Sequence, residues 1–257
     1  MSALRIPDLE GKVYLITGAS IGIGAAVARA FGQQGATVAV HYNSSKSEAE
    51  AVAADIEKAG AKALLVGGDI AKPGGAAALV DATTKKFGRL DGLINNAGSM
   101  VQRKPLIDGN DEFDNTVFDL NAHSVVRASR AALPWLKKQG GVIITTTSLA
   151  ARNGGGTGAT LYAASKGFVS TFTRGLAKEV VKDKIRVNAV APGLITTAFH
   201  DRHTPPDVFK MQEATIPMGR AGTSEECVGT YLFLASEVLS SYITGQIIEI
   251  NGGQFMP

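Results

Sequence analysis

The sequence predicts an α/β protein, a single domain over residues 1–257 whose doubly wound, seven-stranded parallel sheet has helices on both faces. Apolar runs of strand length alternate with amphipathic segments of helix length from end to end, the pattern typical of such sheets. Of the 257 residues, 45% are hydrophobic and 19% charged, which is enough to bury a core and excludes intrinsic disorder. The 30 glycines form short clusters without a triplet period, so they exclude collagen and indicate special turns.

The strands are expected in continuously apolar runs, because helices on both faces bury both sides of a parallel strand. They are Val13–Thr17, Thr37–Tyr42, Ala63–Val66, Gly92–Asn95, Val142–Thr147, Arg186–Ala191 and Gln246–Ile250. The helices are expected in the segments of helical period between these runs. They are Gly22–Gln34, Glu48–Ala59, Ala76–Phe87, Thr116–Lys138, Tyr162–Val181 and Glu225–Ser236.

Charge and cysteine content exclude several classes of protein. The net charge is +3, from 26 basic and 23 acidic residues without a basic cluster, so nucleic acid is not an expected partner. No window approaches the roughly 20 apolar residues that span a bilayer, and we expect no membrane partner and no metal site. The single cysteine, Cys227, excludes internal disulfides and fits a reducing compartment, so we expect a cytoplasmic protein.

The first strand runs into a glycine-rich turn, Thr17-Gly18-Ala19-Ser20-Ile21-Gly22-Ile23-Gly24, which opens a helix. Glycines let a backbone approach a pyrophosphate closely, and a helix N-terminus offers unpaired N–H groups to an anion. The spacing departs from Gly-x-Gly-x-x-Gly, and glycine in such turns also serves packing alone. Its place between a strand and a helix favours dinucleotide binding.

Two further motifs carry polar groups to the same region. Asn95-Asn96-Ala97-Gly98 closes the fourth strand, at the carboxyl edge where such sheets bind ligands, although a polar turn is the simpler interpretation. Tyr162 and Lys166 share a helix face at i and i+4, and an ammonium beside a phenol lowers the tyrosine pKa from about 10. A solvated helical turn is the alternative for that pair.

These motifs, together with Asn121, Ser148 and Pro192-Gly193, resemble the short-chain dehydrogenase/reductase family in order and spacing, from Gly11 to Gly253. The chain is most similar to 3-oxoacyl-acyl-carrier-protein reductases and bacterial sugar or polyol dehydrogenases. The resemblance implies a Rossmann domain and hydride transfer between a nicotinamide cofactor and a carbonyl or secondary alcohol. A non-catalytic dinucleotide-sensing protein with this fold is the competing hypothesis.

The resemblance implies a role for each catalytic residue. Tyr162 would be the general acid in reduction and the base in oxidation. Lys166 would lower the tyrosine pKa and hold the nicotinamide ribose, and Ser148 would donate a hydrogen bond to the substrate carbonyl. Asn121 would anchor a water linking Lys166 to solvent; the alternative is a helical asparagine satisfied by backbone.

The resemblance also implies the cofactor site: Gly18, Ser20, Ile21, Gly22, Ile23, Gly24, Tyr42, Asn43, Ser44, Asp69, Ile70, Asn96, Ala97, Gly98, Tyr162, Lys166, Pro192, Gly193, Ile195 and Thr197. Tyr42 stands where NAD-preferring members carry a carboxylate, so NADP(H) is favoured over NAD(H). Ile21 replaces the usual basic residue, which leaves Lys46 to supply the countercharge. Asp69 would bind the adenine amine, or else cap a helix before Pro73.

The remaining expectations concern substrate and assembly. Residues 198–217 resemble the family's substrate lid, and His200, Arg202 and His203 there either contact an anionic small-molecule substrate or are merely solvated. The long helices Thr116–Lys138 and Tyr162–Val181 would pair in a homotetramer, with Gln246–Pro257 as a second contact. The substrate stays open between an acyl-carrier-protein thioester, a sugar or polyol, and a small ketone.

Overall fold

Seven strands form one parallel sheet in the order β3-β2-β1-β4-β5-β6-β7. The computed structural model describes residues 5–257, so residues 1–4 of the predicted domain lie outside the described residues. The strands are β1 (Val13–Ile16), β2 (Thr37–Tyr42), β3 (Ala63–Gly67), β4 (Gly92–Asn95), β5 (Gly141–Thr146), β6 (Ile185–Pro192) and β7 (Ile247–Ile250). The strand order reverses between β1 and β4, and ligands of such sheets bind at the carboxyl ends there.

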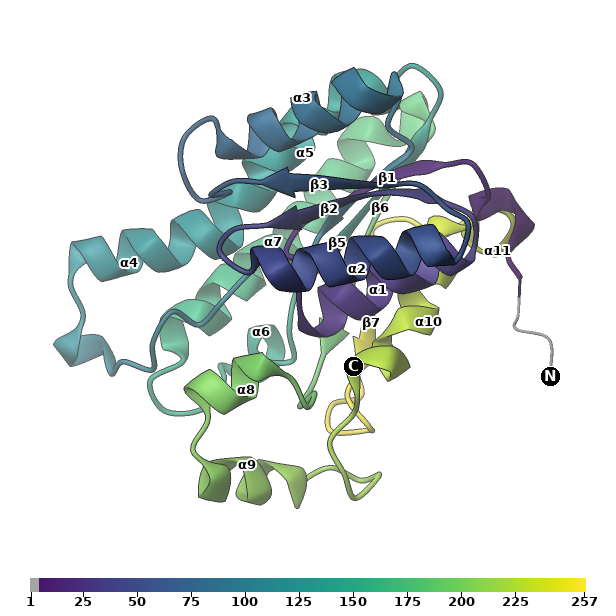
Figure 1. The fold of residues 1–257 in the computed structure, drawn as a ribbon. Coiled ribbons are helices and arrows are strands. Elements are labelled where there is room, and N and C mark those ends of the chain that lie inside the picture. The colour runs from purple at the N-terminus through teal and green to yellow at the C-terminus, as the bar shows by residue number, and fades with distance from the viewer. Residues whose placement is uncertain (1–4) are drawn as a thin grey trace.

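Helices cover both faces of the sheet (Figure 1). One face packs against α1 (Gly22–Gln33), α2 (Lys46–Lys58) and α10 (Ser224–Ala235), and the other against α3 (Gly75–Phe87), α5 (Ser124–Leu136) and α7 (Thr160–Val180). The shorter helices are α4 (Asp111–Phe118), α6 (Ala150–Asn153), α8 (Ala198–His203), α9 (Pro206–Glu213) and α11 (Glu237–Ser240). Figure 1 places α8 and α9 together at one side of the sheet, next to α6.

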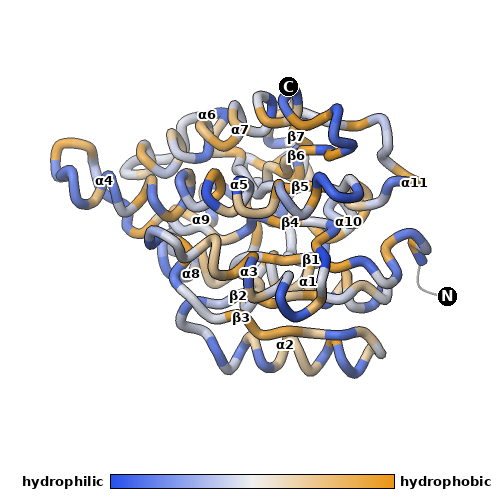
Figure 2. Tube along the Cα trace, turned by 90° about the horizontal axis from the view of Figure 1, so that it is seen from above, coloured by the Kyte–Doolittle hydropathy of each residue, from blue (hydrophilic) through white to orange (hydrophobic). Residues whose placement is uncertain are grey.

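Successive residues of each central strand enter different cores, as the continuous apolar runs predict. In β1, Tyr14 and Ile16 join the cluster that contains Phe31 of α1, whereas Leu15 joins the opposite cluster with Leu136 of α5. Figure 2 shows the strands side by side, from β7 near the top to β3 lower down, and hydrophilic segments along the outer helix α2. The predicted doubly wound sheet is therefore confirmed, with strand ends shifted by one or two residues.

The predicted helix Thr116–Lys138 differs most from the structure. Helix α4 begins earlier, at Asp111, because the Asn110 side chain accepts a hydrogen bond from the Phe113 N–H (2.8 Å). A π-helical turn, Asp119–His123, then separates α4 from α5. Such turns occur frequently at functional sites, and this one contains Asn121.

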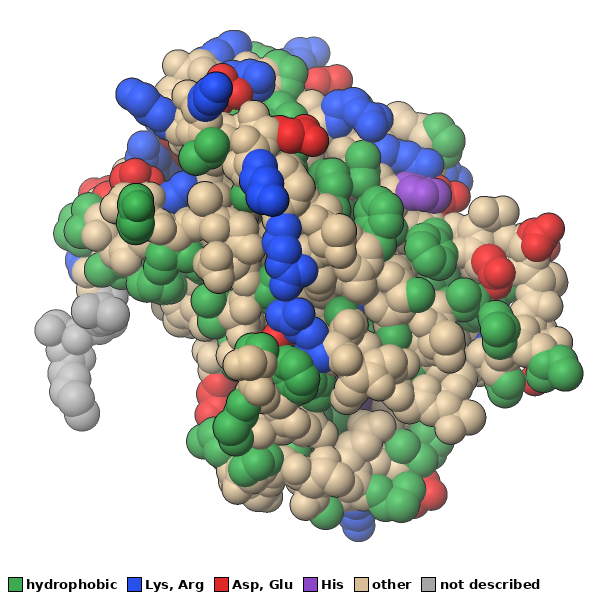
Figure 3. Space-filling model, turned by 180° about the vertical axis from the view of Figure 1, so that it is seen from behind, with side chains coloured by type: hydrophobic (Ala, Val, Ile, Leu, Met, Phe, Trp, Pro, Cys, Tyr) green, Lys and Arg blue, Asp and Glu red, His purple; other side chains and the backbone are tan. Residues whose placement is uncertain are grey.

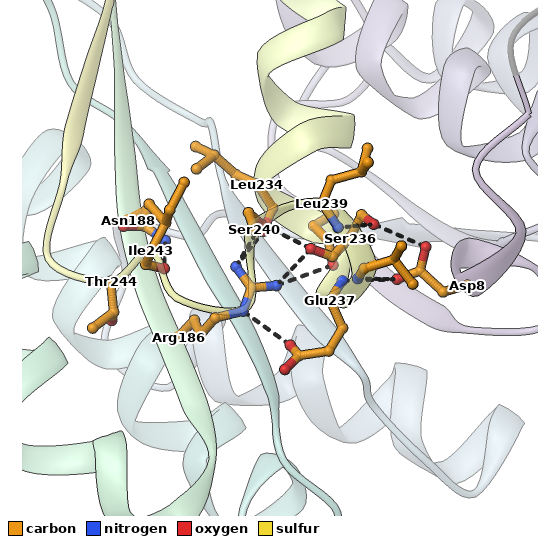
Figure 4. A network of polar contacts seen from close by, with 12 residues as sticks. Asp8, Arg186, Asn188, Leu234, Ser236, Glu237, Leu239, Ser240, Ile243 and Thr244 are labelled. Carbon is orange, nitrogen blue, oxygen red and sulfur yellow. Dashed lines mark hydrogen bonds and ion pairs between the residues drawn. The ribbon is translucent and has the colours of Figure 1, made fainter.

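A polar network closes the amino end of the sheet, away from the strands' carboxyl ends (Figure 4). Arg186, at the start of β6, donates to the carbonyls of Leu234 (2.7 Å) and Ser236 (3.3 Å) at the end of α10. Asp8 accepts from the Ser236 hydroxyl (2.8 Å) and from the Glu237 N–H (2.7 Å) at the start of α11. These bonds satisfy backbone groups that helix ends leave without partners.

Within residues 5–257, no helix has the length and apolar character needed to cross a membrane. The same part of the chain contains no group of three or more His, Cys, Asp or Glu side chains placed to hold a metal ion.

Candidate active site

A cavity of about 540 Å³ opens at the carboxyl ends of the central strands and runs from the start of α2 to α8. Its lining includes every predicted catalytic and cofactor residue except Asn121 and Tyr42. The sequence motifs, which lie far apart in the chain, therefore meet in one site.

The glycine-rich turn after β1 is shaped by close backbone contacts. Gly18 has a φ of +61°, and a Cβ there would lie 2.8 Å from the Ala97 Cα. A Cβ on Gly24 would overlap the Gly18 carbonyl oxygen and the Asn96 amide, so α1 approaches the turn only because this residue is glycine. The Asn96 amide donates to the carbonyls of Thr17 (3.1 Å) and Gly18 (3.0 Å) and braces the turn from β4. This cradle at a helix N-terminus fits a pyrophosphate.

His41 also holds the turn, and the sequence analysis missed it. Its Nδ1 accepts a hydrogen bond from the Gly18 N–H (2.9 Å), so Nε2 carries the proton and donates to the Gly68 carbonyl (2.9 Å). The ring is buried, and burial lowers the histidine pKa. The available signal was the alternation of β2, which points His41 away from the side of Tyr42.

The predicted catalytic residues Ser148, Tyr162 and Lys166 all line the cavity. The Tyr162 phenol forms a hydrogen bond with the Ser148 side chain, and burial, offset only in part by that bond, raises the pKa of Tyr162 to about 12. Lys166 Nζ donates to the Thr146 carbonyl (2.8 Å), and burial lowers the pKa of Lys166 to about 8. Its Nζ lies 5.9 Å from the centroid of the Tyr162 ring. Burial therefore raises the pKa of Tyr162, opposite in direction to the lowering that the Tyr162–Lys166 spacing predicts.

Asn121 lies behind the cavity wall. Its amide donates to the carbonyls of Ser99 (2.8 Å) and Val117 (2.9 Å), and its Oδ1 accepts from the Ser99 N–H (3.0 Å). The side chain is therefore satisfied by backbone, as the alternative interpretation held. A Cβ on Gly98 would lie 2.7 Å from Asn121 Oδ1 and 3.1 Å from Lys166 Nζ, so a glycine lets both side chains approach the turn after β4.

At the end of the cavity next to β2, where the adenine is expected, two residues of the predicted site lie outside the lining. The Tyr42 ring lies over Gly67, where a Cβ would be 2.8 Å from the hydroxyl oxygen, and Lys46 pairs with Glu50 at 3.5 Å. Neither Tyr42 nor Lys46 lines the cavity, whereas Ser45 and Arg202 do, beside Asn43, Ser44, Asp69 and Ile70.

Two carboxyl groups at this end show further contacts. Asp69 Oδ1 accepts a hydrogen bond from the Ala71 N–H (3.0 Å) at the edge of the cavity. The pKa of Glu48, in the first turn of α2, is lowered by its own backbone N–H, by the Ser47 hydroxyl and then by the charge of Arg202. Arg202 of α8 therefore lies close enough to the start of α2 to act on it electrostatically.

Residues 198–217 form two short helices beside the cavity. Helix α8 ends at His203 and α9 begins at Pro206, so Pro205 and Pro206 lie where the helix is interrupted. The Phe199 ring lies 5.6 Å from the Tyr162 ring, and the side chains of His200, Arg202 and His203 line the cavity. Thr197 lies at the start of α8, where its Cγ2 is 3.5 Å from the Cβ position of Gly22.

A glycine cradle at the switch point of a parallel sheet, next to a buried tyrosine, lysine and serine, defines a dinucleotide-dependent oxidoreductase. The family model described as Enoyl-(Acyl carrier protein) reductase matches residues 18–254. The chain belongs to the short-chain dehydrogenase/reductase family and is an NAD(P)-dependent enzyme.

Relatives and solved structures agree with this assignment. A 3-oxoacyl-[acyl-carrier-protein] reductase of Thermotoga maritima is 38% identical over 246 residues, which cover 95% of this chain and 98% of the relative. The structure of an NADH-dependent reductase responsible for alginate metabolism has a TM-score of 0.90 and 38% identity, covering 98% of this chain and 100% of its own. A short-chain dehydrogenase from Burkholderia cenocepacia, solved in complex with NADP, has a TM-score of 0.90 and 33% identity, covering 96% and 99%.

Proposed function

We propose that this enzyme interconverts a carbonyl compound and its secondary alcohol, with Tyr162 as proton donor and acceptor. When bound, the nicotinamide supplies or accepts the hydride. The observation that supports the proposal is the placement of the buried Tyr162 phenol, which lines the cavity and is hydrogen-bonded to Ser148. Ser148 would hold the substrate oxygen, and Lys166 would hold the nicotinamide ribose of a bound cofactor. Asn121 would anchor a water that links Lys166 to solvent.

Replacing the proton donor tests this proposal. Tyr162→Phe removes the hydroxyl and keeps the ring, so turnover should fall by roughly 10²- to 10⁴-fold in a panel of ketones and alcohols. The dissociation constant of the cofactor should change little. Near-normal turnover by this variant would contradict the role of Tyr162, and an inactive parent protein would favour a dinucleotide sensor.

We propose that the cofactor site prefers NADP(H) to NAD(H). The residue that ends β2 is Tyr42 and not a carboxylate; Asn43, Ser44 and Ser45 supply polar groups to the cavity lining, and Arg202 supplies a cation. A 2′-phosphate is bound best by such hydroxyl and guanidinium donors. Among the solved neighbours, one is NADH-dependent and another binds NADP, so this preference has to be measured in this chain.

A fluorescence titration of NADPH and NADH checks the preference. The parent protein should bind NADPH more tightly, and Arg202→Ala should raise its dissociation constant while leaving that of NADH nearly unchanged. Lys46→Ala is the matched control, because its ammonium pairs with Glu50 outside the cavity. Tighter binding of NADH by the parent would refute the proposal.

We propose a homotetramer of single-domain chains, each with residues 198–217 as its lid, in a reducing cytoplasm. Two surfaces support the assembly. On α7, Phe168 is 41% exposed and stacks on Phe172, and Val181 just beyond the helix is 49% exposed. The edge strand β7 has one neighbour and leaves Ile247 and Ile250 only partly buried. Figure 3 shows hydrophobic side chains on both sides of a stripe of Lys and Arg on the rear of the molecule.

A further inference from the structure

Arg103 lines the same cavity as Ser148 and Tyr162. Its Nε donates to the His203 carbonyl of α8 (2.6 Å), and its Nη1 donates to the Thr157 carbonyl (3.0 Å). A guanidinium has five N–H donors in a planar fork, so these two bonds fix its plane and leave three donors for other acceptors. The group is therefore held in place between the lid and the loop that precedes α7.

No described carboxylate pairs with Arg103. Among the side chains that the structure describes, none of the ion pairs includes this arginine. Among the described residues that line the cavity, Asp69 is the one carboxylate, and it lies at the adenine end. Burial lowers the pKa of Arg103, which shows a cation partly withdrawn from water. A partly desolvated cation without a counter-ion favours an anionic ligand.

A second donor points to the same space as Arg103. The Cβ position of Gly156 lies 3.5 Å from Arg103 Nη1 and 3.7 Å from Gln212 Nε2 of α9. Because Gly156 has no side chain, this point between the two donors stays open to the cavity. Two nitrogen donors within 3.7 Å of one point lie close enough together to reach the two oxygens of a carboxylate.

We propose that Arg103 and Gln212 bind a carboxylate of the substrate, so that the enzyme acts on small carbonyl compounds that carry a carboxylate group. The inference rests on the proposed function, since the substrate carbonyl has to reach Tyr162 and Ser148 while the carboxylate reaches Arg103. It disfavours 3-oxoacyl thioesters, which have no carboxylate to offer. The competing role for Arg103 is structural, a clasp between the lid and the loop at Thr157.

The test compares oxo acids with their uncharged counterparts. Reduction of a series from 2-oxo to 5-oxo acids is measured against the methyl ester of each, for the parent, Arg103→Met and Gln212→Glu. The best acid should exceed its ester in kcat/KM at least tenfold in the parent. A hydrogen bond to a charged group is worth a factor of roughly 10 to 100, so Arg103→Met should lower kcat/KM for the acid by that factor, through KM. The kcat/KM values of the esters and the NADPH dissociation constant should each change less than threefold.

Gln212→Glu keeps Arg103 and its two hydrogen bonds but adds a carboxylate that repels an anionic substrate. It should therefore lower kcat/KM for the acids and leave kcat/KM for the esters unchanged. Arg29→Met is the control, because Arg29 pairs with Asp55 on the surface and should leave both substrates unchanged. Equal losses of kcat/KM for acids and esters in Arg103→Met and Gln212→Glu, or no preference for acids in the parent, would overturn the carboxylate site.

Calorimetric binding of the best-bound oxo acid to Tyr162→Phe holding NADP⁺ separates this proposal from the proposed reaction. Acid binding that depends on Arg103 without any turnover in the parent would contradict the reaction and support the site.

Discussion

Substituting Gly98 by alanine adds one methyl group next to both Asn121 and Lys166, so it tests whether their positions matter for turnover. In Gly98→Ala the new Cβ would lie 2.7 Å from Asn121 Oδ1 and 3.1 Å from Lys166 Nζ, whereas ordinary contact begins at about 3.4 Å. Neither neighbour moves freely, because Asn121 is bonded to both backbone groups of Ser99 and Lys166 to the Thr146 carbonyl. Losing the two bonds to Ser99 costs about 1–3 kcal/mol of unfolding free energy, which lowers Tm by roughly 2–12 °C.

The effect on activity should be larger than the effect on stability. A displacement of under 1 Å at Lys166 or Asn121 misaligns the groups behind Tyr162, and misplacement of about this size lowers turnover by roughly 10²-fold. Steady-state kinetics and thermal unfolding of the same preparation measure both effects. Gly229→Ala in α10 is the matched control, since a Cβ there meets nothing within 4 Å. It should stabilise the helix by about 1 kcal/mol without changing turnover. A kcat of Gly98→Ala within twofold of the parent would refute this reasoning.

Three further predictions concern stability, pH and assembly. Arg186→Met removes the donors that close α10 and should lower the unfolding free energy by about 2–4 kcal/mol in urea titrations; an unchanged midpoint would contradict the role of the network in Figure 4. His41 has a lowered pKa in the folded protein, so unfolded chains bind its proton first and stability should fall as the pH drops below about 6.5. His41→Asn should flatten the dependence of Tm on pH between 5 and 7, and an identical slope in the variant would exclude His41 as its source. Light scattering should give a mass near four times 26.7 kDa, and a clean monomer at micromolar concentration would exclude the tetramer.

Part of the site follows from the sequence because the fold itself is repetitive. Each apolar run becomes a parallel strand, and all parallel strands end at one edge, so motifs that follow strands must meet there. The glycine-rich turn and Asn95–Gly98 therefore reach the same cavity from different parts of the chain. Ser148 and Tyr162 reach it by the same logic, because they follow β5.

The tertiary structure alone decided which side chains complete that cavity and how its groups are charged. Arg202 of α8 lines the cavity, whereas Lys46 pairs with Glu50, its i,i+4 neighbour on α2, and does not line it. Local spacing predicts that Lys166 lowers the pKa of Tyr162, yet burial by segments far along the chain raises that pKa. An i,i+4 pattern in the sequence shows which side chains share a helix face. It does not show how deeply they are buried, because the free energy of desolvation depends on all the segments that pack around them.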